Sequence, residues 1–246
     1  MTDMDCITTR EDIEELGTIL CIGAHPDDET WIAGGILATA AKNGQKVVVI
    51  TATKGEAGAT DEERWPQKEL GNIRAQELHE SLRILGVEEH GMLECLDGEC
   101  DKADEQDMAL QLAVVMHREK PDTVMTFGPE GLTGHSDHAA VSRWVSKAAN
   151  LVDCNPKIYH AIHTLEWYER VGKELDEKAN VFFNIEEPPF AELEDLAINY
   201  DLPDDIADLK LKALQAQESQ MEGLLSKFED GRLPGALSQE CFVLVK

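Results

Sequence analysis

Two short clusters of histidine and carboxylate side chains have the composition of sites that bind metal ions and move protons. The first, Ala24 to Glu29 (AHPDDE), places one histidine and three carboxylates in five positions. The second, Gly134 to His138 (GHSDH), places two histidines and one aspartate in four positions. Imidazole nitrogens and carboxylate oxygens bind Zn²⁺, and the same groups act as general acids and bases. Both clusters are therefore candidate parts of a hydrolytic metal site.

The first cluster has two readings. Asp27 and Asp28 repel each other unless a cation, a helix N-terminus or water compensates them. One reading is an acidic first helical turn, capped by Asp28 or Thr30, with His25 incidental. The other is a set of metal ligands, which Pro26 favours because it fixes its own φ and biases His25 toward an extended backbone. The segment also lacks the G-x-G-x-x-G fingerprint, which argues against a dinucleotide cofactor.

The second cluster also has two interpretations. It is either a polar helix start, capped by Ser136 or Asp137 with solvated histidines, or the second half of a metal site. The i, i+3 spacing of His135 and His138 puts both rings on one side of a helix that begins there.

The elements that would position these clusters alternate between strands and helices. Apolar runs predict strands at residues 18–24, 46–52, 90–96, 122–128 and 157–162. Residues 139–149 carry an apolar stripe at helical spacing. We therefore predict an α/β fold with a Rossmann-like, doubly wound, mostly parallel sheet flanked by helices. In such sheets the first and fourth strands can be neighbours at the switch point, where the two clusters would converge.

The C-terminal part has a different amino-acid composition. From residue 186 the chain is acidic and proline-containing, followed by a helical segment at about 209–228 and a final apolar run, ECFVLV. We expect one domain over residues 1–246, with 186–246 as an integral part or as a peripheral lobe that caps the site.

Composition narrows the classes of partner and compartment. The 246 residues include 49 Asp and Glu against 22 Lys and Arg, a formal charge of -27, which disfavours nucleic acids and anionic membranes. Six scattered cysteines without a C-x-x-C pair fit a reducing compartment. The start lacks a signal peptide and no apolar run reaches about 18 residues. We expect a cytoplasmic protein that binds a small molecule, and both a monomer and a homo-oligomer stay open.

The two clusters together resemble the PIG-L/LmbE-like N-acetylglucosaminyl deacetylase family, whose signatures are AHPDDE and a later H-x-D-H. The resemblance extends over about residues 18–222 and includes looser motifs, which are Gly55-Glu56, Arg74 with Glu77, Leu85-Gly86, Leu96-Asp97-Gly98, Lys212-Ala213 and Ser219-Gln220.

The resemblance implies a role for each matching residue. By this likeness the metal ligands are His25, Asp28 and His138, with water completing the coordination of one Zn²⁺ per chain. Asp27 then resembles the general base, and His135 resembles a protonated electrophile beside the oxyanion, with Asp137 as its orienting partner. The family's substrate-contacting positions fall on Arg74, Glu56 and Asp97. Other divalent metals, iron among them, also occupy such nitrogen and oxygen sites.

Two positions depart from the family pattern or add to it. Gln217 stands where the family often has a histidine, which puts any role of a ring nitrogen there in doubt. Trp31 is bulky and belongs either to the mouth of the pocket or to the core.

The sequence thus predicts zinc-dependent hydrolysis of an N-acetyl amide on a small glucosamine-like sugar or conjugate, with Asp27 as base and zinc-bound water as nucleophile. Asp27 and His135 are both candidates to protonate the leaving amine. Two alternatives stay open, an amidase acting on a thiol-cofactor type of conjugate and a catalytically idle module that binds a metal or ligand.

Overall fold

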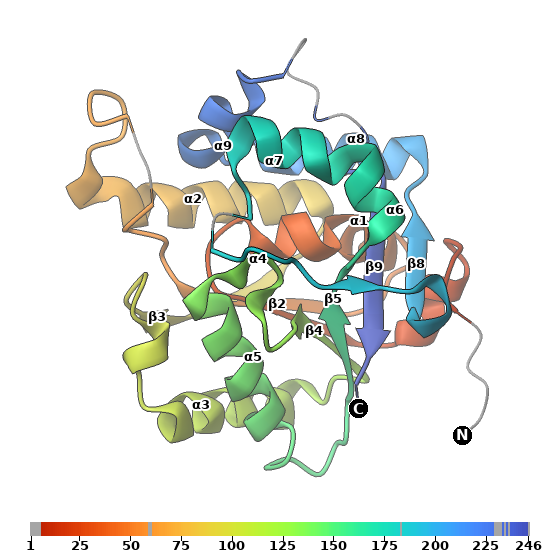
Figure 1. Ribbon diagram of the computed structural model, residues 1–246. Coiled ribbons are helices and arrows are strands. Elements are labelled where there is room, and N and C mark those ends of the chain that lie inside the picture. The colour runs from red at the N-terminus through yellow and green to blue at the C-terminus, as the bar shows by residue number, and fades with distance from the viewer. Residues whose placement is uncertain are drawn as a thin grey trace.

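A seven-stranded sheet forms the centre of the protein in the computed structural model, which describes residues 6–58, 61–182, 184–228, 233, 235 and 237–245 (Figure 1). The strand order is β3-β2-β1-β4-β5-β9-β8. The bounds of these strands are β1 Ile19–Gly23, β2 Val47–Thr53, β3 Glu89–Cys95, β4 Thr123–Phe127, β5 Lys157–Ala161, β8 Ile198–Asp201 and β9 Gln239–Leu244. All five strands expected from apolar runs are present within one residue at each end.

The first five strands are parallel, and β9 runs antiparallel to both β5 and β8. β1 pairs with β2 on one side, with Gly23 opposite Thr51, and with β4 on the other, with Cys21 opposite Met125. Every residue of β1, β2 and β4 is buried, because helices cover both faces of the sheet. The expected α/β fold is confirmed, including the adjacency of the first and fourth strands.

The helices lie in two layers (Figure 1). On one face α3 (Glu105–Glu119) packs against α5 (Ser136–Ala148), and on the other α8 (Asp204–Gln215) packs against α1 (Asp28–Lys42) and α2 (Gln67–Leu85). In α5 the predicted apolar stripe is buried, with Trp144 1% exposed. The remaining elements are η1 (Asp12–Leu16), η2 (Cys100–Lys102), α4 (Gly131–Gly134), β6 (His163–Thr164), α6 (Leu165–Trp167), the π-helical turn η3 (Tyr168–Gly172), α7 (Lys173–Ala179), β7 (Phe190–Ala191), η4 (Leu193–Asp195) and α9 (Glu218–Leu225).

The C-terminal region contributes to the central sheet. β8 and β9 complete one edge of it, and Phe242 is fully buried in the main core. The helical segment expected at 209–228 consists of two helices, α8 and α9, because the helix ends at Gln215 and Gln217 adopts a non-helical conformation. A second apolar cluster joins α6, η3 and α7 to α8 and α9. Within the described part of the chain, no helix combines the length and apolarity needed to cross a bilayer.

Candidate active site

The two polar clusters converge at the carboxyl ends of neighbouring strands. Residues 24–29 follow β1 and lead into α1, while His135 precedes the first residue of α5 in the connection after β4. Because β1 pairs with β4, side chains more than a hundred positions apart contact each other, as His25 and His138 do. Both clusters line one cavity of about 540 Å³.

Three potential ligand side chains face one another at this point. His25 Nδ1 lies 3.3 Å from His138 Nε2, and the two oxygens of Asp28 lie near one nitrogen each, Oδ2 3.5 Å from His25 Nδ1 and Oδ1 3.3 Å from His138 Nε2. Ligand atoms around a tetrahedral zinc with bonds of about 2.05 Å are separated by about 3.3 Å. The contacts among the three side chains therefore have the spacing of a zinc ligand set, and all three residues are buried.

Neighbouring groups fix which ring nitrogen of each histidine faces the other two side chains. His138 Nδ1 donates to the carbonyl oxygen of Gly131 at 3.0 Å, which leaves Nε2 as an acceptor. His25 Nε2 lies 3.1 Å from Asp97 Oδ1 and 3.3 Å from Asp137 Oδ2, which leaves Nδ1 as an acceptor. A carboxylate or carbonyl behind a ligating histidine is the usual arrangement at metal sites.

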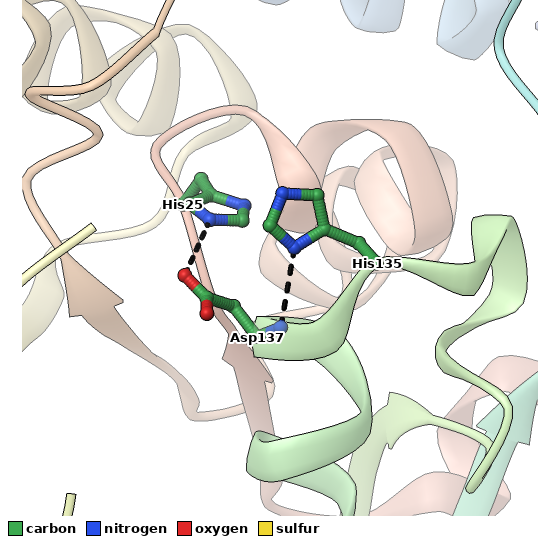
Figure 2. A group of neighbouring side chains, drawn as sticks. All are labelled: His25, His135 and Asp137. Carbon is green, nitrogen blue, oxygen red and sulfur yellow. Dashed lines mark hydrogen bonds and ion pairs between the residues drawn. The ribbon is translucent and has the colours of Figure 1, made fainter. Parts of the chain in front are cut away.

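A second triple is also close enough to share an ion. It consists of His25, His135 and Asp137 (Figure 2). Both oxygens of its carboxylate accept backbone N–H groups, Oδ2 from Gly98 at 2.8 Å and Oδ1 from Cys100 at 3.1 Å, and Oδ2 also contacts His25. These bonds outweigh burial and lower the pKa of Asp137 to about 2. In Asp28 both backbone N–H bonds, from Ala24 and His25, go to Oδ2, so Oδ1 accepts none from the described residues and faces His138. We therefore favour His25, Asp28 and His138 as the set that could hold the metal.

The charge around the set also suits a cation. The carboxylates of Asp27, Asp28, Asp97 and Asp137 lie around the histidines. Burial opposes protonation of His25, yet its hydrogen bonds to Asp137, Asp28 and Asp97 raise its pKa well above the ordinary value. This local excess of negative charge is what a divalent ion would neutralise.

Asp27 stands beside the ligand set in an unusual backbone conformation, with φ of 111°. Its carbonyl oxygen accepts the N–H groups of Thr30 and Trp31 and so starts α1. Its carboxylate lines the cavity and lies 3.1 Å from a guanidinium nitrogen of Arg74. Burial raises the pKa of Asp27 to about 6 even though Arg74 lowers it. A carboxylate with a raised pKa beside a metal site is suited to accept a proton.

The three residues expected to contact substrate have different surroundings. Arg74 lines the cavity but donates to the carbonyl oxygens of Pro26 and Gly55 as well as to Asp27. Asp97 also lines the cavity, and it contacts His25 and accepts the N–H of Ala57. Glu56 accepts the N–H of Asp97 and is not among the described residues that line the cavity. Their contact with substrate stays a prediction.

His135 is half-buried at the cavity, and its ring centroid lies 4.7 Å from that of His25. Its Nδ1 accepts the backbone N–H of Asp137 at 3.2 Å, which leaves an N–H on Nε2 (Figure 2). Burial and the nearby rings of His25 and His138 lower the pKa of His135, although Asp137 acts in the opposite direction. By the resemblance, Asp137 is expected to orient His135. The backbone N–H of Asp137 contacts His135 and its carboxylate contacts His25, and the orienting role stays a prediction.

Several residues to which the sequence analysis assigned no catalytic or ligand role also contribute to the site. Glu29 is 1% exposed, accepts the Asp27 N–H at 3.2 Å and lies 3.4 Å from Gln217 Nε2. Gln217, which stands where the family often has a histidine, thus donates its side-chain amide to Glu29. Trp31 both lines the cavity and packs against the two apolar clusters, so both expectations for it are met. His163, the first residue of β6, lines the cavity too.

The fold and site define an α/β protein with a histidine and aspartate cluster at the switch point of its sheet. Residues 20–149 match the PIG-L family, described as GlcNAc-PI de-N-acetylase. Since this match covers more than half of the chain, the protein belongs to the PIG-L family.

Similar curated proteins agree with this assignment, and a solved structure shares the fold. A 1D-myo-inositol 2-acetamido-2-deoxy-alpha-D-glucopyranoside deacetylase from Corynebacterium diphtheriae is 34% identical over 58% of this chain and 55% of its own length. A protein of the same name from Actinosynnema mirum is 28% identical over 82% of this chain and 80% of its own length. The chain thus spans about half the length of the first of these relatives. The structure of N,N'-diacetylchitobiose deacetylase from Pyrococcus horikoshii has a TM-score of 0.66 and 23% identity, covering 95% of this chain and 85% of that one.

Proposed function

We propose that this protein is a metal-dependent deacetylase that hydrolyses the acetamido group of a small glucosamine-like conjugate. The observation that carries the proposal is the close approach of His25, Asp28 and His138, whose facing atoms lie 3.3–3.5 Å apart, beside the carboxylate of Asp27, which lines the same cavity. The family and the names of the curated relatives support the same reaction class.

In this proposal His25, Asp28 and His138 hold one zinc ion. Zinc bound there would supply Lewis acidity, which polarises a carbonyl group and lowers the pKa of a bound water to about 7. Two imidazoles and one carboxylate are a common zinc ligand set, and iron is accepted by similar donors. We further propose a cytoplasmic location, supported by six cysteines that are all unpaired.

Asp27 is the proposed general base. Its carboxylate takes a proton from the attacking water as the new carbon–oxygen bond forms at the acetyl carbon. Arg74, at 3.1 Å, holds the carboxylate in position and keeps its charged form available. When the carbon–nitrogen bond breaks, the same proton can return to the leaving amine, so that acetate and a free amine are the products.

His135 is the proposed donor to the carbonyl oxygen on which negative charge develops. The hydrogen bond from the Asp137 N–H to Nδ1 places the remaining proton of a neutral ring on Nε2. A neutral imidazole can therefore donate to the oxygen without being protonated. One such donor contributes a factor of about 10² to 10³ to turnover.

Release of free amine tests this function. Metal-loaded protein is incubated with N-acetylglucosaminyl-inositol and a panel of other N-acetylglucosaminides, and the new amine is quantified by a fluorogenic reagent. The proposal predicts amine release that a chelator abolishes and zinc restores. An absence of amine from every amide in the panel, with metal bound at one ion per chain, would instead support an idle binding module.

A further inference from the structure

The wall of the cavity that contains the metal-site residues has a polar part and an apolar part. The polar part includes His25 with Asp97, which are in contact, and Asp27 with Arg74, which form an ion pair. The apolar part consists of side chains from the segment after β5 and from α1 and α9, all but Ile162 of which belong to the second apolar cluster or pack against it, namely Trp31, Ile162, Trp167, Leu175, Val181, Phe182 and Leu224. We call these two parts the metal-site end and the apolar end. In Figure 1, α6 and α7 lie beyond the carboxyl end of β5, which the arrowhead of that strand marks.

The polar side chains at the apolar end are largely engaged by the protein itself. Glu240 accepts hydrogen bonds from Lys210 at 2.7 Å and from the N–H groups of Gly35 and Ile36. Gln239 donates to Asn199 at 2.9 Å. A hydroxyl-rich group placed here would give up its water contacts for few replacements, which is unfavourable. This end is thus poorly suited to an inositol ring.

The apolar wall is packed in advance of any ligand. The rings of His163 and Trp167 stack with centroids 3.8 Å apart and planes at 7°. Burial lowers the pKa of His163 to about 3, so this imidazole is neutral. Gly172 makes room for the indole, because a Cβ at this position would lie 2.5 Å from the Trp167 ring. A preformed apolar pocket binds ligands without the cost of first ordering its walls.

We propose that the substrate carries an apolar group, aromatic or branched, which occupies this end of the cavity while its amide lies at the metal-site end. This inference rests on the proposed deacetylase function and narrows its substrate class. The apolar group has two chemical sources, the aglycone of an N-acetylglucosaminide or an N-acyl chain longer than acetyl. In either case the preferred substrate differs from the inositol conjugate in the names of the curated relatives.

Matched substrates test the proposal. The ratio kcat/KM is measured for the phenyl, methyl and myo-inositol N-acetylglucosaminides and for methyl glucosaminides with N-acetyl and N-hexanoyl groups. If the apolar group is the aglycone, kcat/KM for the phenyl substrate should exceed that for the methyl substrate by about tenfold or more. If it is the acyl chain, kcat/KM for the N-hexanoyl substrate should exceed that for the N-acetyl substrate by about the same factor. Equal values across the panel, or a preference for the inositol conjugate, would overturn the proposal and leave the deacetylase function standing.

A pair of leucines in α9 supplies a variant and its control. Leu224 lines the cavity, whereas Leu225 packs against the same apolar cluster without being among the described residues of the cavity wall. Leu224→Asn should lower the preference for the apolar substrate about fivefold, while Leu225→Asn should leave it unchanged. An equal response of the two variants would contradict the inference.

A binding measurement distinguishes an error in the proposed apolar subsite from an error in the proposed deacetylase reaction. Trp31 and Trp167 both lie in the cavity wall, so tryptophan fluorescence should respond to phenyl glucoside, which has no acetamido group. If no amide is hydrolysed but phenyl glucoside still quenches the fluorescence, and Leu224→Asn weakens this effect, the subsite stands and the proposed reaction fails. If phenyl glucoside binds no better than methyl glucoside, the apolar subsite is wrong.

Discussion

Asp27 combines a partly buried carboxylate with a backbone conformation of positive φ. A φ of 111° is rare for residues other than glycine and costs about 1–3 kcal/mol where it is imposed. Three interactions hold it in place: Arg74 donates to the Pro26 carbonyl and to the Asp27 carboxylate, and Glu29 accepts the Asp27 N–H. The strain therefore coincides with the proposed base and fixes where its carboxylate points.

Replacing the base should separate metal binding from turnover. Asp27→Ala keeps all three proposed ligands, so we expect zinc content close to that of the wild type. Turnover should fall by about 10² to 10⁴ because general base catalysis is lost. Metal analysis and amine release on the same preparation check this, and wild-type turnover in the variant would remove Asp27 from the role of base.

Arg74 should influence the pH dependence through Asp27. Burial raises the pKa of Asp27, and the positive charge of Arg74 lowers it. Removing that charge in Arg74→Gln should raise this pKa further. Because the base acts in its deprotonated form, the acid limb of kcat/KM should move to higher pH.

The matched control for Arg74→Gln is Arg83→Gln in the same helix. Arg83 is exposed and pairs with Glu80, away from the cavity. Its replacement should leave the pH profile in place. If the acid limb of the kcat/KM profile is unchanged in both variants, Arg74 does not act on the pKa of Asp27.

At the level of single residues, the sequence predicted which side chains meet and was less informative about what each one contacts. The convergence of the two clusters was predictable because they follow strands that can be neighbours at the switch point, whereas the choice of His25, Asp28 and His138 within them came from the resemblance to the family. The contact between Asp137 and His25 was not predictable, because it depends on the turn that brings Gly98 and Cys100 onto the same carboxylate. Spacing along a helix start does not determine such a turn.

At the level of elements, a buried ion pair fastens α1 to α8 and β9. Lys210 and Glu240 are each 1% exposed and 2.7 Å apart, and Lys210 also donates to the carbonyl oxygen of Trp31. Gly34 and Gly35 leave room on α1 for the side chains of Lys210 and Leu202. The pair thereby helps to position the helix that begins at Asp28.

Removing one member of this ion pair should destabilise the folded protein. Lys210→Met leaves Glu240 buried without its cation, and we expect a loss of about 3–5 kcal/mol in the free energy of unfolding. Urea denaturation measures it. The double variant Lys210→Met with Glu240→Leu removes the unpaired charge but leaves the N–H groups of Gly35 and Ile36 without their acceptor, so it should recover only part of the loss. Lys42→Met, at an exposed pair with Asp205, should have little effect. A loss confined to the double variant would contradict this account of the pair.

The sequence predicted the strands better than the C-terminal elements. Fully buried parallel strands appear as continuous apolar runs, which is why β1, β2 and β4 were predictable. Apolar residues also predicted β3 and β5, although no residue of β3 is buried. The joining of β8 and β9 to the same sheet was not predictable, because antiparallel pairing at an edge depends on contacts distant in sequence. Since both strands complete the central sheet, we propose that residues 1–246 form one domain, with α6, η3 and α7 over the cavity.

At the scale of the whole molecule, the formal charge of -27 coexists with a cavity whose walls are partly apolar. The acidic surface made polyanionic partners improbable from composition alone. The apolar end of the cavity was not predictable, because its wall is assembled from α1, α9 and the segment after β5. Composition thus limits the class of partner, and the assembled cavity determines which substrates fit.

Zinc titration of the metal-free protein tests the central claim most directly. Metal-free protein is titrated with zinc while amine release from an N-acetylglucosaminide is recorded, alongside His138→Ala, which lacks one proposed ligand. We predict that activity rises from near zero and saturates at about one zinc per chain, whereas His138→Ala neither retains zinc nor gains activity. Full activity in metal-free protein, or unchanged zinc stoichiometry and activity in His138→Ala, would contradict the account.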